Sequence, residues 1–584
     1  MKLQDLQTSP ASDLNYQNLR FDYTRHADQD CSPPASHPVV VVGAGLVGLA
    51  LAIDLAQQGQ AVLLLDNDCT LSTGSRAICF AKRTLEVFDR LGCGPRMVAK
   101  GVSWNVGRVF FKNEEIYSFD LLPESGHERP AFINLQQYYV EGYLAERSAQ
   151  LPLIDLRWKS KVVGISQHTD HALLTVETPD GAYQIKASYV AACDGSRSNL
   201  RKLMGQESQG RVFRDRFLIA DVKVQPVLTT PKAAKPAQSA SEKQRTHAVP
   251  GIGEKGFAER WFWFDPEVHP NQSVLLHKQP DDVWRIDFQL GWDADPEEEK
   301  KPEKIIPRVK ALLGDDAQFE LEWASVYTFA CQRMERFRHG RVLFAGDAAH
   351  GVSPFGARGA NSGVQDADNL AWKLAAVLRG EAPDALLDSY ASEREYAADE
   401  NIRNSTRATD FITPKSDMSR LFRDAVLELA KQHSFARTLV NSGRLSLPST
   451  FLESPLNTPD ADKFDGVMVP GAPAADAPVV HADGAVDWLL RTLRPTGFTA
   501  LVFGDPILTE RLRASIAQLK VVSIGNRRAN ELAWLRYDAT PGTVYLFRPD
   551  QHVCARWRFA SIGAVRTGLG KALERAVGQA LVIS

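Results

Sequence analysis

A glycine-rich turn between two apolar runs constrains the fold of this chain more than any other feature. The run Val39–Val42 is β-branched and suits a strand buried on both faces. A GxGxxG turn, a stretch of helix formers ending at Gly59, a second apolar run and then Asp66 follow. Strand, glycine turn, helix, strand and acid, in that order, are typical of the dinucleotide-binding unit of an α/β fold.

The spacing within this unit indicates what it binds. Gly43, Gly45 and Gly48 let the backbone approach a pyrophosphate, and the helix that follows offers free N–H groups and a positive dipole end. Asp66 comes 23 residues after Gly43, where a ribose-binding carboxylate is expected. A plain structural turn is the alternative, and the complete context argues against it. The unit alone does not separate NAD from FAD.

Composition excludes several classes of protein. The 584 residues are 44% hydrophobic and 24% charged, which is typical of a globular chain with about three to five domain-sized units. The formal net charge of -3 gives no basic excess for binding nucleic acid. The seven cysteines are scattered without a CxxC pair, so we expect no disulfide scaffold, no metal site and a cytoplasmic location. No apolar run reaches the length of about 18 residues that a membrane span needs.

Two later segments end in an acidic residue next to a glycine. Residues 189–201 form a small apolar strand that ends in Asp194-Gly195. Residues 341–350 form another strand, which ends in Gly346-Asp347. Asp194 alone would more often be a surface turn residue, but the second pair argues for a shared role. A loop rich in proline and glycine follows at 353–362, and then a helix with apolar residues at steps of three and four.

The three motifs together resemble those of a known family. In this order and at these distances they are similar to the single-component flavoprotein aromatic hydroxylases of the para-hydroxybenzoate hydroxylase type. The family patterns DGxxSxxR, GDAAH and DAxNLxWKL match residues 194–201, 346–350 and 366–374. The family often reads GGQGMN before the last helix, whereas this chain reads GARGAN, so that Arg358 replaces a neutral residue.

The resemblance implies FAD as the cofactor, with NADH or NADPH as a transient reductant. The positions that would hold FAD are Gly43, Gly45, Gly48, Asp66, Arg76, Gln137, Asp194, Gly195, Gly346, Asp347, Pro354, Gly359, Ala360 and Asn361. Among them, Asp66 would bind the adenosine ribose, Asp347 and Gln137 the ribityl chain, and Pro354 the isoalloxazine. The N–H groups of Ala360 and Asn361 would open a helix and stabilise negative charge at the N1–C2=O edge of the flavin.

The resemblance also implies the reaction. The expected enzyme is a monooxygenase that hydroxylates a phenolic or aromatic-acid substrate with NAD(P)H and O₂ through a flavin C4a-hydroperoxide. Such a site excludes water and favours the phenolate. His350 is a candidate catalytic residue because of its titration range, with a structural hydrogen-bonding role as the alternative. Arg358 is a candidate for binding a substrate carboxylate, with an exposed charge as the alternative.

The patterns and the resemblance predict an α/β fold with three parts. These are a Rossmann-like FAD-binding domain, an interleaved antiparallel-sheet substrate domain, and a thioredoxin-like C-terminal domain without CxxC. An N-terminal extension is expected at 1–37. The FAD-binding domain is expected within 38–400, in pieces near 38–105, 130–204 and 331–400, and the substrate sheet near 106–129 and 205–330. A helical segment and linker at 401–464 would then lead to the thioredoxin-like domain at 465–584.

Three further segments carry smaller expectations. The stretch 227–253, rich in Pro, Ala, Ser and Lys, is predicted to be a mobile loop. Trp261 and Trp263 form a WxW that is more typical of sheet packing than of the halogenase motif. The polar residues of 548–552, in the sequence RPDQH, are expected to serve folding or an interface with the rest of the chain.

Two alternative functions stay open at the level of sequence. One is an enzyme of the same fold that acts on a polyketide-like or non-aromatic substrate. The other is a non-catalytic flavin-binding redox-sensing protein, since the motifs argue for FAD binding rather than for chemistry. The expected partners are a small aromatic substrate, O₂ and NAD(P)H, and the resemblance alone suggests a homodimer. The sequence does not choose the substrate or between NADH and NADPH.

Overall fold

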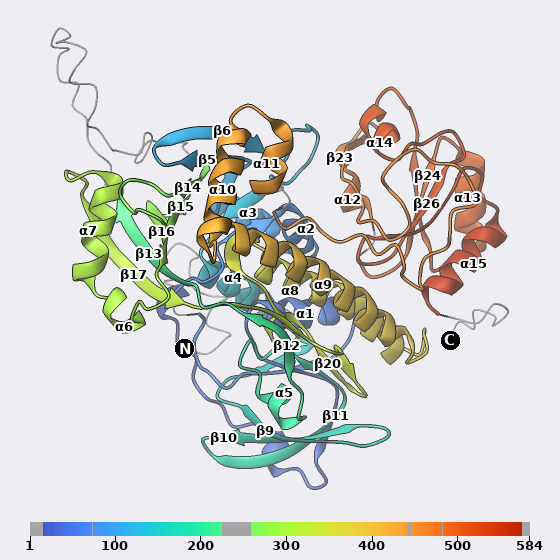
Figure 1. Ribbon diagram of the computed structural model, residues 1–584. Coiled ribbons are helices and arrows are strands. Elements are labelled where there is room, and N and C mark those ends of the chain that lie inside the picture. The colour runs from blue at the N-terminus through green and yellow to red at the C-terminus, as the bar shows by residue number, and fades with distance from the viewer. Residues whose placement is uncertain are drawn as a thin grey trace.

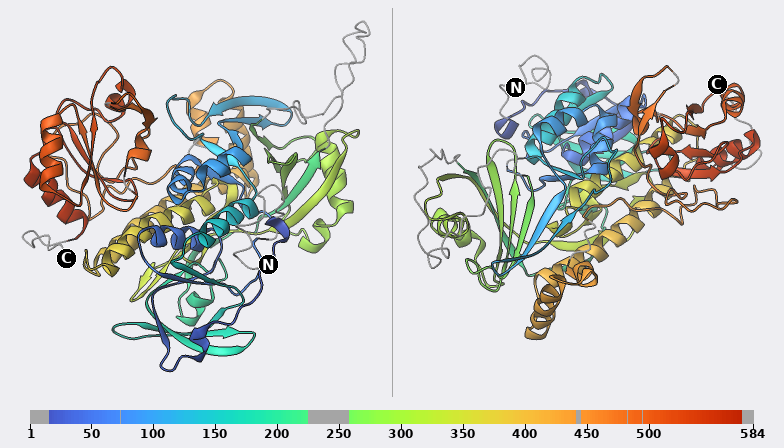
Figure 2. Two further views of the ribbon diagram at one scale, coloured as in Figure 1. Left: turned by 180° about the vertical axis from the view of Figure 1, so that it is seen from behind. Right: turned by 90° about the horizontal axis from the view of Figure 1, so that it is seen from above.

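The structure is a computed structural model that describes residues 16–72, 74–224, 258–440, 445–481, 483–493 and 495–574 (Figure 1). The loop expected at 227–253 lies outside the described residues. Seen from above, a body built on a parallel sheet lies between a second, seven-stranded sheet and a C-terminal body (Figure 2). In the described part of the chain, no helix is long and apolar enough to cross a membrane.

Five parallel strands form the centre of the parallel-sheet body. Their order is β20 (Val342–Phe344), β11 (Gly181–Ala192), β1 (Ala35–Val42), β2 (Val62–Leu65) and β8 (Ile154–Arg157). The apolar runs of β1 and β2 are buried, as expected for parallel strands that helices cover. Antiparallel strands extend the sheet, namely β19 (Arg338–His339), β10 (Ala172–Thr178) and β9 (Lys161–Gln167).

Three helices cover this sheet near its centre. Helix α1 (Leu46–Gln57) connects β1 to β2 and packs against α4 (Gln137–Ala149) and α8 (Gly359–Leu378). Helix α1 is buried around most of its circumference because it lies between the sheet and these two helices. Gly59 follows its end with a φ of 81°, which confirms the predicted glycine stop. The long helix α9 (Leu386–Ile412) packs along α8 and crosses the expected boundary at residue 400.

The seven-stranded sheet contains the runs predicted as strands. Its order is β17 (Phe319–Tyr327), β13 (Arg216–Val224), β16 (Val283–Leu290), β15 (Ser273–Lys278), β14 (Arg260–Phe264), β5 (Val106–Phe111) and β6 (Glu114–Asp120). Neighbouring strands are antiparallel except β14 and β5, which pair in parallel. This exception arises because the chain leaves and re-enters the sheet between them through a long connection rather than a hairpin.

One face of this sheet packs against helix α7 (Pro302–Leu313) (Figure 1). Trp261 and Trp263 are buried there with Ile305 and Val309, which confirms that the two tryptophans serve sheet packing. The short helix α6 (Pro296–Glu299) precedes α7, and the side chain of Asp295 caps it.

Smaller elements connect the two sheets. They are β3 (Cys79–Ala81), α2 (Lys82–Leu91), α3 (Gly94–Lys100), β4 (Val102–Trp104), β7 (Phe132–Asn134), α5 (Asn199–Leu203), β12 (Ser208–Val212), β18 (Ala330–Met334), β21 (His350–Gly351), α10 (Asp417–Ala430) and α11 (Ser434–Val440).

The described part of the predicted N-terminal extension packs onto the parallel-sheet body. Phe21 stacks on Trp158 with the ring centroids 4.4 Å apart, and Tyr16 is buried against Gly142 of α4.

The C-terminal body has the strand order of a thioredoxin-like domain. Its sheet runs β25 (Lys520–Ile524), β24 (Thr499–Phe503), β26 (Val544–Phe547) and β27 (Val553–Trp557), with only β24 and β25 parallel. Helices α13 (Pro506–Ser515), α14 (Glu531–Arg536) and α15 (Ile562–Ala572) accompany the sheet. Cys554 is fully buried, and burial raises its pKa to about 12, so it is not a reactive thiol.

A buried ion network joins the C-terminal body to the parallel-sheet body. Arg548 donates to Glu393 of α9 at 2.6 Å and to Asp550 at 3.0 Å. Asp550 in turn accepts a hydrogen bond from Trp372 of α8 at 3.1 Å. Burial favours the neutral form of Glu393, but Arg548 and Lys373 outweigh it and hold the pKa of Glu393 below its usual range. The expectation that the RPDQH segment serves an interface is therefore confirmed.

We expect Arg548→Met to destabilise the protein strongly. The substitution leaves Glu393 and Asp550 buried without their counterion, which costs about 3–5 kcal/mol. Urea unfolding followed by tryptophan fluorescence measures the loss. The matched control is Arg513→Met, which breaks an exposed pair with Glu510 in the same body and is expected to change stability by less than about 1 kcal/mol. Equal effects of the two substitutions would contradict a role for Arg548 at the interface.

Candidate functional site

Four strands of the parallel sheet end at one edge, and predicted residues follow each of them. Gly43 follows β1, Asp66 follows β2, Asp194 comes just after β11, and Asp347 comes just after β20. The chain leaves β1 toward β2 on one side, while β11 pairs with β1 on the other. Ligands of open α/β sheets bind at such a switch point, beyond the carboxyl ends of the strands.

The three glycines of the turn differ in what they do. Gly43 has a φ of 104°, and a Cβ there would lie 2.4 Å from the carbonyl oxygen of Cys193. A Cβ on Gly48 would lie 1.8 Å from the carbonyl oxygen of Gly43. These two glycines therefore serve the close packing of turn, strand and helix. A Cβ on Gly45 would meet only Glu141 Oε1, at 3.9 Å, so the protein itself has room for a side chain there.

The space at Gly45 fits a diphosphate. Gly45 is the N-cap of α1 and offers no side chain to the first N–H groups of that helix. Those N–H groups and the positive end of the helix dipole attract an anion. Asp66 Oδ2 accepts a hydrogen bond from the N–H of Ala44 at 2.6 Å, and Asp66 Oδ1 accepts one from Asp68 at 2.7 Å. Asp66 thus fixes the turn and keeps further lone pairs for a ribose.

Glu141 is a site residue that sequence reasoning missed. It is 3% exposed on α4 and accepts hydrogen bonds from the N–H of Ser72 at 2.8 Å and from Gln137 Nε2 at 2.8 Å. Gln137 Oε1 accepts from the N–H of Ala77 at 3.1 Å. The two α4 residues therefore hold Ser72 and Ala77 beside the turn. An acid one helical turn after Gln137 was the available signal.

Asp347 is accessible between buried neighbours. The residue is exposed although Gly346 and Ala348 on either side are buried. Even so, surrounding protein raises the pKa of Asp347, while His350 and the exposed Arg76 act on it in the opposite direction. An accessible carboxylate just beyond the end of β20 suits the hydroxyl groups of a ribityl chain.

Asp194 has an unused buried oxygen. Asp194 Oδ2 caps α5 by accepting from the N–H groups of Asn199 at 2.7 Å and Leu200 at 3.0 Å. Asp194 Oδ1 is buried and has no hydrogen-bond partner among the described residues. A buried acceptor left unpaired costs about 1–3 kcal/mol, so a donor from a ligand fits this position. Gly195 beside it has a φ of 76° and open space around a Cβ, which suits a close approach.

Ser198 and Arg201 of the second motif serve the structure. Ser198 accepts a hydrogen bond from the N–H of Arg201 at 3.0 Å, and Arg201 donates to the carbonyl oxygen of Ala348 at 2.8 Å. The motif thus connects the end of β11 to the end of β20.

His350 belongs to a buried network, in which its Nδ1 has no hydrogen-bond partner among the described residues. Its Nε2 lies 2.7 Å from Asp366 Oδ2, and it is 2% exposed. Asp366 also accepts from the N–H of Gly346 at 2.8 Å and from Arg394 Nε at 2.6 Å. Burial favours the neutral form of Asp366, but His350 and Arg394 outweigh it and hold its pKa below the usual range. This geometry gives His350 a structural role, and the catalytic role stays a prediction.

The loop before α8 meets the seven-stranded sheet. Pro354 is exposed, and the first N–H groups of α8, at Gly359 and Ala360, are free of intrahelical partners. Asn361 Oδ1 accepts from the N–H of Ala81 at 2.8 Å. Phe355 packs edge-on against Phe217 of β13, with the ring centroids 4.8 Å apart. A flat group lying on Pro354 would therefore have one face of this sheet opposite it.

Arg358 lies at the same loop but is directed elsewhere. It is 6% exposed, and its Nη1 donates to Asn401 of α9 at 3.2 Å. The alternative of an exposed charge is therefore wrong, because the guanidinium is buried against α9. Its binding of a substrate stays a prediction.

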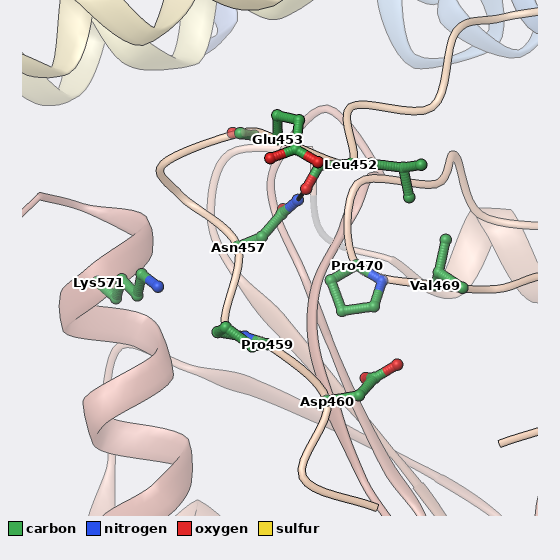
Figure 3. Close-up of a pocket in the computed structure, with 9 residues that line it drawn as sticks. Leu452, Glu453, Asn457, Pro459, Asp460, Val469, Pro470 and Lys571 are labelled. Carbon is green, nitrogen blue, oxygen red and sulfur yellow. Dashed lines mark hydrogen bonds between the residues drawn. The ribbon is translucent and has the colours of Figure 1, made fainter. Parts of the chain in front are cut away.

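Two hollows lie away from this edge. One, of about 390 Å³, is formed by the linker before the C-terminal body together with α15 (Figure 3). Asp460 in its wall is already bound by Arg556 at 2.6 Å, and Lys571 lies on the opposite side. A second hollow, of about 430 Å³, lies beside Trp104 and the start of β14 at Glu259. The predicted cofactor residues line neither hollow.

Comparison with known proteins agrees with this geometry. Residues 36–405, more than half of the chain, match the family model described as FAD binding domain. A 3-(3-hydroxy-phenyl)propionate/3-hydroxycinnamic acid hydroxylase of Mycolicibacterium smegmatis is 27% identical over 86% of this chain and 84% of its own length. A probable NADH-specific resorcinol 4-hydroxylase of Rhodococcus jostii is 32% identical over 61% of this chain and 62% of its own length.

Solved structures share the fold. The flavin-dependent monooxygenase PieE, in complex with FAD and substrate, has a TM-score of 0.75 at 18% identity, over 93% of this chain and 99% of its own. The p-nitrophenol 4-monooxygenase PnpA of Pseudomonas putida has a TM-score of 0.58 at 25% identity, over 71% of this chain and 100% of its own. The expected fold is thereby confirmed. This chain belongs to the FAD binding domain family and is a flavoprotein of the aromatic hydroxylase type, as its three motifs predict.

Proposed function

We propose that this chain hydroxylates a phenolic or aromatic-acid substrate with O₂ and with NADH or NADPH as reductant, using FAD. The observation that carries the proposal is the meeting of two surfaces at Phe355. On one side lies the strand edge fitted to FAD, and on the other lies a sheet face with both aromatic and charged side chains. The named activities of the phenylpropionate and resorcinol hydroxylases support the choice of a phenolic ring.

Different parts of the chain have different roles in the proposed reaction. FAD, when bound, supplies the redox chemistry with the nicotinamide and O₂. The N-terminus of α1 at Gly45 binds the diphosphate, and Asp194 and Asp347 accept hydrogen bonds from hydroxyl groups of the cofactor. The N-terminus of α8 stabilises negative charge on the ring edge. The aromatic residues around Phe355 exclude water from the space where the substrate ring would lie.

We infer three further properties from the sequence. The protein acts in the cytoplasm, assembles as a homodimer, and keeps the domain boundaries given above, except the one at residue 400, which lies inside helix α9. The resemblance supports the homodimer, and the unpaired cysteines support the reducing compartment.

Gly45→Val tests the diphosphate site. A side chain there meets little of the protein but enters the space assigned to the cofactor. We expect the dissociation constant for FAD, measured by fluorescence quenching on the apoprotein, to rise at least about 100-fold. The thermal midpoint of the apoprotein is expected to change by less than about 3 °C. Gly570→Ala, in open space on α15, is the control and keeps wild-type affinity. Unchanged FAD binding by Gly45→Val contradicts the assignment.

Turnover with ¹⁸O₂ tests the reaction. The flavoprotein is incubated with NADH or NADPH and a panel of phenols and phenolic acids, and the products are analysed by mass spectrometry. We expect a phenolic compound to stimulate oxidation of the nicotinamide and to gain one labelled oxygen atom. A polyketide-type or non-aromatic product would indicate the other substrate class. A flavoprotein that neither consumes nicotinamide with any substrate nor forms peroxide would indicate a redox sensor.

A further inference from the structure

One rung of the seven-stranded sheet carries charged side chains toward the loop before α8. Across β14, β15, β16 and β13, the register pairs Arg260 with His277, His277 with Arg285, and Arg285 with Asp221. Side chains at one rung share a face of the sheet, and the intervening Trp261 points to the opposite face, which α7 covers. The charged rung therefore lies on the face that meets Phe355. In agreement, Arg260 Nη2 lies 3.4 Å from the carbonyl oxygen of Phe355.

Half of this rung is neutralised within the protein. Arg285 binds Asp221 through two hydrogen bonds, of 2.8 Å and 2.7 Å, and also donates to the carbonyl oxygens of Ser75 and Arg76. These contacts satisfy the guanidinium and fix the backbone of Ser75 and Arg76 to the sheet. The pair therefore has a structural role and leaves no charge for a ligand.

Arg260 is not neutralised in this way. It is 7% exposed, and its Nε has no hydrogen-bond partner among the described residues. Burial lowers the pKa of Arg260, and Cys79 and Asp287 oppose this shift, but no described residue forms an ion pair with its guanidinium. A buried guanidinium without a close counterion is unfavourable, and a ligand carboxylate that binds it removes this penalty.

Asp287 is the second unsatisfied group of this face. It lies two residues after Arg285 on β16, and its Oδ1 has no hydrogen-bond partner among the described residues. Its side chain is partly accessible, although protein surrounds it and raises its pKa to about 7. The part of this sheet face bounded by Arg260, His277 and Asp287 is here named the recess. The carboxyl is close to half protonated at neutral pH, so it cancels the charge of Arg260 only in part.

The recess adjoins the predicted flavin edge. His277 Nδ1 lies 3.9 Å from Cys79 Sγ, and the carbonyl oxygen of Cys79 accepts from Asn361 Nδ2 at 2.9 Å. Asn361 is in the first turn of α8, whose N–H groups are assigned to the cofactor ring. One short chain of contacts thus connects the rung to that ring.

We propose that Arg260 binds the carboxylate of an aromatic-acid substrate, with Asp287 and His277 lining the same recess. This inference rests on the proposed function, and it narrows the substrate from phenols in general to phenols that carry an acidic group. Arg260 is then a specificity-determining residue, because it distinguishes an acid from a neutral ring of the same shape.

Matched ligands test the inference by isothermal titration calorimetry on the FAD-loaded protein. The ligands are hydroxybenzoic, hydroxyphenylacetic and 3-(3-hydroxyphenyl)propionic acids, each with its primary amide. We expect the wild-type protein to bind at least one acid about 10- to 100-fold more tightly than its amide. Arg260→Met is expected to lose this preference. Its affinity for the acid would fall by that factor, and its affinity for the amide by less than about threefold.

Two further variants keep the result interpretable. Arg260→Lys retains a charge and is expected to keep part of the preference, so a folding defect in Arg260→Met does not decide the outcome. Arg108→Met is the matched control, since Arg108 lies on the neighbouring strand β5 opposite Trp261 and pairs with Glu259 and Glu115. It is expected to keep the wild-type preference. Flavin content and thermal midpoint are recorded for every variant.

The outcomes separate this inference from the proposed function. If the wild-type protein binds no acid more tightly than its amide, or if Arg260→Met weakens both equally, the carboxylate assignment is wrong. Labelled product from a neutral phenol would then leave the proposed function standing. Conversely, an acid preference that depends on Arg260 supports the assignment even if no ligand in the panel is hydroxylated.

The pH dependence of binding gives a second readout. The groups that face Asp287 are Arg260, Arg285, Asp221, His277, Cys79 and Tyr327. Burial lowers the pKa of His277 well below its usual value and raises the pKa of Cys79 to about 11, so neither titrates between pH 6 and 8. As the pH rises through the pKa of Asp287, a second negative charge forms beside the ligand carboxylate. We expect the dissociation constant of the acid to rise about 3- to 10-fold from pH 6 to 8.

The amide ligand and the variant Asp287→Asn provide the controls for this readout. The amide carries no charge, so its affinity is expected to stay constant between pH 6 and 8. Asp287→Asn is expected to bind the acid with the same affinity at both pH values. A pH dependence that persists in Asp287→Asn would contradict the placement of Asp287 beside the ligand carboxylate.

Discussion

The buried carboxylate of Asp366 joins the elements at which the flavin is predicted to bind. It accepts hydrogen bonds from the end of β20 at Gly346, from His350 and from Arg394 of α9, while it belongs itself to α8. One side chain thereby fixes a strand end and two long helices relative to each other. The free N–H groups at the start of α8 can serve a cofactor only if that helix end keeps its place, so the site depends on this carboxylate.

The same helix also carries the contact to the C-terminal body. Further along α8, Trp372 donates to Asp550 of that body, and Lys373 donates to Glu393 of α9 at 2.8 Å. The thioredoxin-like body has no dithiol, and this buried ion network is one of its contacts with the rest of the chain. This contact therefore braces the helix whose other end is predicted to face the flavin.

The sequence predicted which residues follow the strands of the parallel sheet. It did not predict which side chains of the seven-stranded sheet and of α9 lie near them. The glycine turn and the acids after the strands are local patterns, and the period of two in the sheet strands is local as well. Arg260 becomes meaningful only beside His277 and Phe355, which are 17 and 95 residues away in the chain. Likewise, the motif that placed Arg358 near the ring could not show that its side chain is directed at Asn401 of α9. Such directions depend on tertiary packing rather than on spacing.

Arg285 connects the seven-stranded sheet to the backbone beside the glycine turn. One guanidinium is bound to Asp221 within the sheet and to the carbonyl oxygens of Ser75 and Arg76 in the segment that α4 holds beside the glycine turn. A shift of β16 therefore reaches the backbone of Arg76 through a single rigid side chain. The seven-stranded sheet and the cation that acts on Asp347 are therefore joined through one side chain rather than through a moving domain.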